Sequence, residues 1–263
     1  MKLKKIYGAY FSPTGNTKKV VQGLLECFST YATQEINLTL PEVRKKNFRF
    51  ADNDLLILGV PSYAGRAPKA VVEAVQNFRS TNTPIVLVVT YGNRAIDDTL
   101  MELNKVTSAQ GFISVGAGVF IGQHSYLKEL AQFRPDEKDM QIVKEFGMKL
   151  KERLRVLVLY NKTYFEIPGS YPYEKPPMGE FPFLPETNDN CIYCMLCANF
   201  CPMEAISMSN PKKIDSKKCV RCTSCIRVCP TQAKYMTPEP FAAIQEKLAP
   251  LVEVRQEPWY VVC

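Results

Sequence analysis

No apolar run in this 263-residue chain approaches the roughly 18 residues that cross a bilayer, so no membrane span is expected. No Gly-x-Gly-x-x-Gly follows a predicted strand, and no Gly-Lys-Ser/Thr closes a glycine loop. The sequence therefore predicts neither a dinucleotide site nor a Walker A site. Histidine and tryptophan occur once each, as His124 and Trp259. No catalytic acid stands out, and we assign no catalytic residue.

The composition is that of a folded protein. Hydrophobic residues make up 46% of the chain, which is ordinary for globular proteins. The length accommodates one domain of about 150–180 residues and a smaller second one. Residues 1–11 carry three lysines and a short apolar stretch, but a polar loop follows at once. We expect a first β-strand there and not an export signal.

The first 160 residues alternate apolar and amphipathic segments. Strands are predicted at 5–10, 35–38, 54–60, 84–90 and 112–120, and helices at 17–31, 68–78, 95–110 and 136–159. Because several strands are apolar throughout, we expect both faces of the sheet to be covered. The predicted fold class is α/β, with a doubly wound parallel sheet of five strands. Ligands of such sheets lie beyond the carboxyl ends of the strands, here loops 12–17, 61–67 and 91–94.

Composition also divides the chain. We expect a first domain at 1–160, a proline-rich linker at 161–187, a cysteine-rich domain at 188–237 and a tail at 238–263 that packs on the body. The linker is expected to be stiff and extended and to pack through its aromatic side chains. An amphipathic stretch occupies residues 241–248 of the tail.

Eight of the ten cysteines lie between residues 191 and 229. They form two runs with the spacing C-x2-C-x2-C-x3-C, each followed by proline: Cys191, Cys194, Cys197 and Cys201, then Cys219, Cys222, Cys225 and Cys229. The runs begin 28 residues apart and indicate an internal repeat. Zinc sites commonly use two separated C-x2-C pairs, and disulfide frameworks spread their cysteines across a small secreted domain. Neither alternative suits this pattern as well as iron–sulfur clusters do.

Residues 188–237 resemble the two-cluster bacterial ferredoxins, which pass single electrons. The resemblance implies two [4Fe-4S] clusters, each held by three cysteines of one run and the fourth of the other. One cluster would take Cys191, Cys194, Cys197 and Cys229, and the other Cys219, Cys222, Cys225 and Cys201. Three thiolates on one tight loop reach three corners of a cubane, so the fourth ligand comes from elsewhere. We expect Ile192, Tyr193, Phe200, Ile206 and Val220 to shield the sulfurs from water.

The formal net charge of +7 is not evidence for nucleic acid binding. Eight bound thiolates would add about −8 and two cluster cores about +4, which leaves a weakly basic protein. Short basic runs occur at residues 2–5, 44–46, 212–213 and 217–218. They are either solvated surface or docking sites for an acidic partner.

The loop Ser12-Pro13-Thr14-Gly15-Asn16-Thr17 joins the first strand to the first helix. It resembles the flavodoxin phosphate loop, T/S-x-T-G-N-T, which holds the phosphate of FMN. Hydroxyl groups, a flexible glycine and a helix N-terminus all favour a bound anion. The alternative is an ordinary Ser/Thr helix cap.

The resemblance implies that the next two loops flank the flavin ring. The cofactor-binding residues expected there are Pro61, Ser62, Tyr63, Ala64 and Gly65, then Tyr91, Gly92, Asn93 and Arg94. Tyr63 or Tyr91 would stack on the ring, and Gly65 and Gly92 would let the backbone approach it. Arg66 or Arg94 near the ring would stabilise the anionic hydroquinone and raise the two-electron potential.

Three other side chains are considered for a role in function. His124 follows the fifth predicted strand and is either a proton donor to the flavin or a plain loop residue. Cys27 is expected on a helix face, and Cys263 as a free terminal thiol.

The whole chain resembles flavodoxin–ferredoxin fusion proteins. This implies electron transfer between two [4Fe-4S] clusters and FMN within one chain. Two functions remain open: a carrier between unidentified redox protein partners, and an FMN-dependent reductase that passes electrons from the clusters to a small molecule. A structural or nucleic-acid-binding module has little support. The clusters imply a reducing cytoplasm and an anaerobic host.

Overall fold

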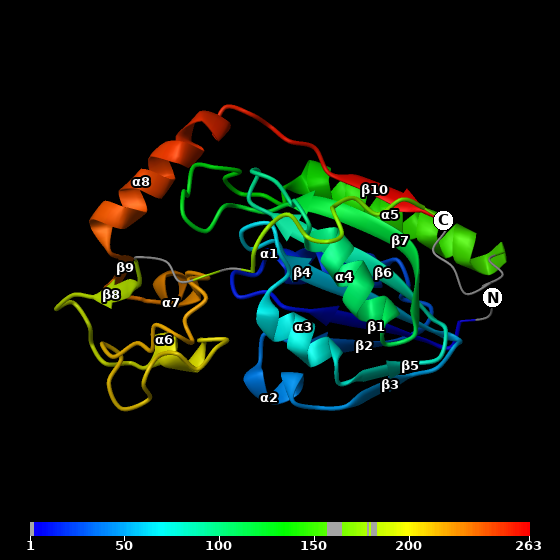
Figure 1. The fold of residues 1–263 in the computed structure, drawn as a ribbon, viewed down its shortest axis with the longest axis horizontal. Coiled ribbons are helices and arrows are strands. Elements are labelled where there is room, and N and C mark those ends of the chain that lie inside the picture. Colours follow the sequence, from blue (N-terminus) through cyan, green and yellow to red (C-terminus); the bar gives the residue numbers. More distant parts are fainter. Residues whose placement is uncertain (1–2, 157–164, 178, 180–182) are drawn as a thin grey trace.

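The computed structural model describes residues 3–156, 165–177, 179 and 183–263. At its centre is a six-stranded sheet in the order β10-β7-β6-β4-β1-β2 (Figure 1). Five strands are parallel: β1 (Lys5–Tyr10), β2 (Ala32–Asn37), β4 (Asp54–Pro61), β6 (Thr83–Tyr91) and β7 (Phe112–Ile121). Numbered along the chain, these five have the order 2-1-3-4-5, which is that of flavodoxin-like sheets. The expected fold class is confirmed.

The sixth strand was not predicted. β10 (Trp259–Val262) comes from the C-terminal tail and pairs antiparallel with β7, so the expectation of five strands was one too few. All ten residues of β7 are buried, and an apolar edge strand needs a cover. The tail provides it, and the ring of Tyr260 stacks on that of Phe146 at 4.9 Å.

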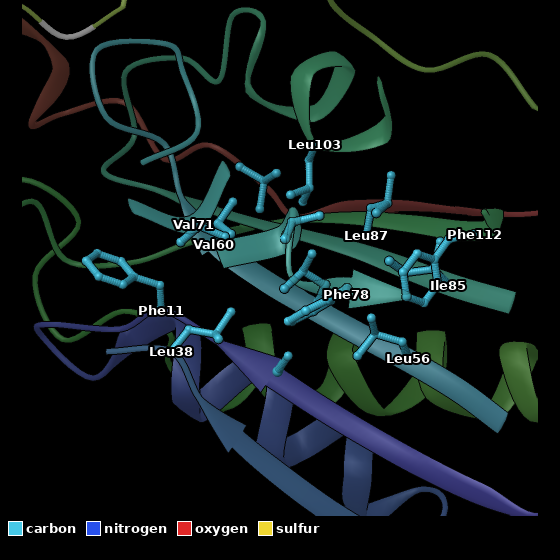
Figure 2. Packing of buried hydrophobic residues seen from close by; sticks show 14 of the residues in the cluster. Phe11, Leu38, Leu56, Val60, Val71, Phe78, Ile85, Leu87, Leu103 and Phe112 are labelled. Atoms are coloured by element: carbon cyan, nitrogen blue, oxygen red, sulfur yellow. The ribbon is translucent and has the colours of Figure 1, made fainter. Parts of the chain in front are cut away.

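Helices cover both faces of the sheet. α1 (Asn16–Glu26) and α5 (Glu137–Val156) pack on one face, and α3 (Lys69–Val75) and α4 (Thr99–Ser108) pack on the other (Figure 1). Figure 2 shows the second face, where Leu56, Val60 and Leu87 of the sheet meet Val71 and Leu103 of the helices. Residues 157–159 of the last predicted helix lie outside the described residues.

Two short features of the fold were not predicted from the sequence. α2 (Pro41–Arg44) is a single turn, and β3 (Phe48–Phe50) pairs in parallel with β5 (Phe78–Ser80) beside the main sheet. The rings of Phe50 and Phe78 lie 5.3 Å apart and join this pair to the core. Three-residue strands are too short to show an alternation.

The cysteine-rich segment lies beyond one end of the sheet (Figure 1). It contains β8 (Pro185–Thr187) paired antiparallel with β9 (Lys234–Met236), and the short helices α6 (Leu196–Asn199) and α7 (Ser224–Arg227). α8 (Pro238–Leu248) follows, continued by a turn of 3-10 helix at Ala249–Leu251. The tail then runs back along the molecule to β10. No helix in the described ranges is long and apolar enough to cross a membrane.

The described part of the linker packs on the body near the start of α4. The Asp98 carboxylate accepts hydrogen bonds from the backbone N–H groups of Ser170 (2.9 Å) and Lys175 (2.8 Å). The Lys105 ammonium lies 4.5 Å from the Tyr171 ring centre. Residues 161–164, 178 and 180–182 of the expected linker lie outside the described residues, and the domain limits remain a prediction.

Gly59 in β4 sets how closely α1 approaches the sheet. A Cβ atom there would lie 2.4 Å from a methyl carbon of Val21 and 2.9 Å from one of Thr17. We expect Gly59→Ala to push α1 outward and to lower the urea midpoint by the equivalent of about 1–3 kcal/mol. Gly179→Ala is the control, since a Cβ there meets no atom within 4 Å. Equal midpoints for the two variants would contradict this packing.

Candidate cofactor sites

The residue before α1 supplies no cap of its own. Gly15 has φ 93° and no side chain, and the first turn of the helix holds no acidic residue. Ser12 Oγ accepts the backbone N–H of Lys18 at 3.0 Å, while Thr17 and Thr90 share a hydroxyl hydrogen bond of 2.6 Å. The free N–H groups of such a helix end favour an anion.

A cavity of about 230 Å³ opens beside this helix end. Eleven of the fourteen predicted cofactor-binding residues line it: Ser12, Thr14, Asn16, Thr17, Pro61, Ser62, Tyr63, Ala64, Tyr91, Gly92 and Arg94. Gly15, Gly65 and Asn93 do not. We call this cavity the loop pocket, because the loops that follow β1, β4, β6 and β7 meet there.

Gly65 belongs to a tight turn and does not line the loop pocket. Ala64 (φ 52°) and Gly65 (φ 84°) form a tight left-handed turn, closed by hydrogen bonds of 2.9 and 3.1 Å between Tyr63 and Arg66. A Cβ on Gly65 would lie 2.5 Å from an oxygen of Asp97.

The Arg66 side chain does not line the loop pocket either. Its buried guanidinium donates to both oxygens of Glu102, at 2.9 and 2.5 Å, and to the carbonyl of Lys175 at 2.6 Å. It lies over the ring of Tyr173, 4.0 Å from the centre. Of the two arginines that the sequence suggested for the flavin, Arg94 alone lines the pocket, and it pairs with Asp97.

Asn93 holds the C-terminal tail. Its amide nitrogen donates to the carbonyls of Leu251 (3.2 Å) and Val254 (2.6 Å), and its oxygen accepts the backbone N–H of Gln256 (3.2 Å). The side chain is therefore occupied, contrary to the expectation that it would face a ligand. From the sequence, Asn93 is an asparagine in a loop that follows a strand. The segment that it binds becomes visible only in the folded structure.

Sequence reasoning missed most of the loop after β7. It singled out His124, yet Gly122, Gln123, Ser125 and Tyr126 line the pocket as well. Asn16 Nδ2 donates to the Gln123 carbonyl at 3.2 Å and draws this loop to α1. The position of the loop, at the carboxyl end of a parallel strand, was the available signal.

His124 is held as a neutral imidazole. Its Nδ1 accepts the backbone N–H of Tyr126 at 3.0 Å, so Nε2 carries the proton. The ring packs on Gly92, where a Cβ would lie 2.4 Å from it. Burial, together with the Arg94 cation, lowers the pKa of His124 from 6.5 to about 4.

The eight clustered cysteines line two small cavities. Cys191, Cys194, Cys197 and Cys229 line one, and Cys201, Cys219, Cys222 and Cys225 line the other. The chain thus brings together three cysteines of each run with the fourth of the other, the two sets derived from the sequence. All ten cysteines fall within the described residues and each is free of disulfides. Their ligand roles remain predictions.

Each cavity is lined by four cysteine side chains, which is the number of ligands that a [4Fe-4S] cluster takes. The backbone N–H groups of Ala205 and Ala233 donate to the sulfurs of Cys201 (3.3 Å) and Cys229 (3.2 Å). Burial raises the pKa of Cys225 to about 12, so metal binding there must release a proton.

The expected apolar shield is only partly present. Ile206 is buried, but Ile192, Tyr193 and Phe200 are 65%, 54% and 57% exposed. Cys194 is exposed as well. The cavity that contains Cys194 therefore lies near the surface, which the sequence pattern did not indicate.

The loop pocket and one cysteine cavity share a wall. Val220, Arg221 and Cys222 line both of them. Ile244 and Leu248 of α8 add a further wall to the loop pocket. Burial raises the pKa of Tyr63 well above its usual range, and the Cys222 thiol is the second contribution.

Residues 190–233 match the 4Fe-4S dicluster domain family. The match implies two [4Fe-4S] clusters. Among curated proteins, no sequence matches this chain.

Several solved structures are similar over the first part of the chain. A flavodoxin from the domain Archaea is 13% identical, with a TM-score of 0.40, over 57% of this chain and 99% of its own. The flavin mononucleotide-bound flavodoxin of Fusobacterium nucleatum is 16% identical, with a TM-score of 0.41, over 57% and 98%. Rubredoxin oxygen:oxidoreductase of Desulfovibrio gigas is 14% identical, with a TM-score of 0.40, over 59% and 37%. The assignment of the fold rests on the strand order given above.

His124 gives a prediction on pH. Its pKa is lower in the folded chain than in the unfolded one, so the unfolded chain binds more protons between pH 4 and 6.5. The free energy of unfolding should therefore rise across this range and level off above it. As the only histidine, His124 can be titrated by NMR without assignment, and we expect a pKa near 4. A pKa near 6.5 would show that the imidazole is solvated.

Proposed function

We propose that this protein transfers electrons between two [4Fe-4S] clusters and an FMN bound in the loop pocket, as a carrier between redox protein partners. The supporting observation is the shared wall, since Cys222 lines both the loop pocket and a cysteine cavity. Single electrons from the clusters and one or two electrons on the flavin are the chemistry these groups supply when bound.

The residues around the loop pocket fit FMN. The N-terminus of α1, with Gly15 before it and the hydroxyls of Ser12, Thr14 and Thr17 nearby, suits a phosphate. Tyr63 and Tyr91 both line the pocket and offer aromatic faces to a flavin ring. Among the described residues that line the pocket, the cations are Arg94 and Arg221, and the backbone dipoles of α1 would add to the attraction for the phosphate.

The two cysteine cavities differ in their surroundings. The one with Cys222 adjoins the loop pocket, while the one with Cys194 lies at an exposed surface. We therefore assign the Cys219, Cys222, Cys225 and Cys201 cluster to exchange with the flavin. The Cys191, Cys194, Cys197 and Cys229 cluster would exchange with a partner protein, in a reducing compartment such as the cytoplasm.

The cover over the pocket favours the carrier. Apolar side chains of α8, Ile244 and Leu248, and the cysteine segment stand where a small-molecule acceptor would approach. A reductase is the second candidate because His124 lines the same pocket with a protonated Nε2. Steady, flavin-dependent turnover of a quinone or nitro compound would favour the reductase.

Thr14→Asp tests the phosphate site. A carboxylate beside the helix end would repel the phosphate of FMN, and we expect affinity for FMN to fall at least 100-fold. Riboflavin has no phosphate, so its affinity should fall much less. Calorimetric titration of both flavins into the deflavinated protein measures this, with iron content as the check on folding. Equal losses for the two flavins would place the phosphate elsewhere.

Cys194 and Cys222 occupy equivalent positions in the internal repeat and form a matched pair. In Cys222→Ser, we expect cluster-to-flavin transfer to slow at least tenfold, because the cluster next to the pocket is altered. In Cys194→Ser, transfer from a chemical reductant should persist. Stopped-flow absorbance of flavin bleaching after mixing with dithionite, compared with free FMN, follows both. Equal rates in the two variants would contradict the assigned order of the clusters.

A further inference from the structure

The two halves of the internal repeat differ at a buried position near their ends. Cys201 is followed four residues later by Ala205 and then by Ile206, whereas Cys229 is followed by Ala233 and then by Lys234. Ile206 is 5% exposed and Lys234 is 3% exposed. The second half of the repeat therefore buries a lysine where the first buries an isoleucine.

The Lys234 ammonium has little local compensation. Nζ donates a 2.5 Å hydrogen bond to the Pro211 carbonyl. Across the described residues, no ion pair includes Lys234. A buried ammonium costs several kcal/mol unless an anion compensates it, and one carbonyl oxygen is not an anion.

Lys234 lies beside one cysteine cavity, and its charge acts on a thiol of each cavity. Lys234 lines the cavity of Cys191, Cys194, Cys197 and Cys229. Cys197 and Cys225, one from each cavity, are both 7% exposed and pack in one apolar cluster with Ile206. Burial raises the pKa of Cys197 and Cys225, and the Lys234 ammonium opposes the rise in each.

Anions of the right strength would be present only with the clusters bound. Each [4Fe-4S] centre with four cysteine ligands carries a net charge of about −2, and reduction by one electron makes it about −3. A fixed cation close to two such centres stabilises the reduced form of each. The cation also weakens the repulsion between the two negative centres. With the cation present, reduction of one centre therefore opposes reduction of the other less than it would without the cation.

We propose that Lys234 is the shared internal counter-charge of the two clusters and raises the reduction potential of both. The inference rests on the cluster half of the proposed function and is independent of FMN. Lys234 does not touch a reacting atom of a substrate. It sets the potential at which each cluster accepts its electron from a donor.

Lys234→Gln is the decisive variant, because the neutral amide can still donate to a carbonyl. We expect both clusters to titrate at lower potential, with the ratio of reduced to oxidised cluster falling at least tenfold at a fixed potential, or about 59 mV for one electron. Lys234→Arg keeps the charge and should stay close to the wild type. Lys213→Met removes an exposed lysine from the same domain and should change little, because solvent screens that charge.

The readout is an anaerobic titration with dithionite and mediators, followed by electron paramagnetic resonance, on the full chain with measured iron and sulfide. Lys234→Gln with full iron and unchanged potentials would overturn the proposal. If Lys234→Gln loses its clusters, the Lys234→Arg variant decides between charge and packing. If Lys234→Arg keeps its clusters at wild-type potentials, the charge of the side chain is what matters. If Lys234→Arg also loses its clusters, Lys234 has a packing role and the proposal fails. A wild-type protein without iron or sulfide would refute the proposed function itself.

Discussion

The arrangement depends on the contact between the carboxyl ends of the parallel strands and the second cysteine run. Electron transfer weakens steeply with distance, and in the proposed function the flavin and one cluster would lie on two sides of a thin wall. Val220, Arg221 and Cys222 form that wall. The sheet positions the loop pocket at this edge for a topological reason, since all four pocket loops leave the same ends of parallel strands.

Contacts far apart in the sequence hold the wall in place. Arg44 of α2 donates to the carbonyls of Leu38 (2.8 Å) and Pro202 (2.6 Å), and so ties the sheet to the first cysteine run. On the other side, the rings of Tyr126, Phe183 and Phe241 pack together at 5.4–5.7 Å. Asn93 fixes the tail, so α8 is held at both ends.

Three cationic side chains lie beside the cavities. Arg221 is 5% exposed, donates to the Cys219 carbonyl at 2.8 Å and lines both cavities of the shared wall. Lys234 lines the cavity of Cys191, Cys194, Cys197 and Cys229, and Arg94 lines the loop pocket. In the proposed function, these cations would favour the reduced, more negative states of the cofactors. Part of the formal net charge of +7 is therefore carried beside the cavities.

The sequence by itself determined the five parallel strands, because apolar runs depend on local spacing. It also predicted a phosphate-type loop and two sets of four cysteines, and each of these sets lines one cavity of the structure. Only the tertiary structure decided which cysteine run meets the pocket and where α8 and β10 lie. It also decided that Arg66 and Asn93 bind protein segments instead of a ligand. These features depend on contacts between residues 36 to 163 positions apart, and no local pattern encodes them.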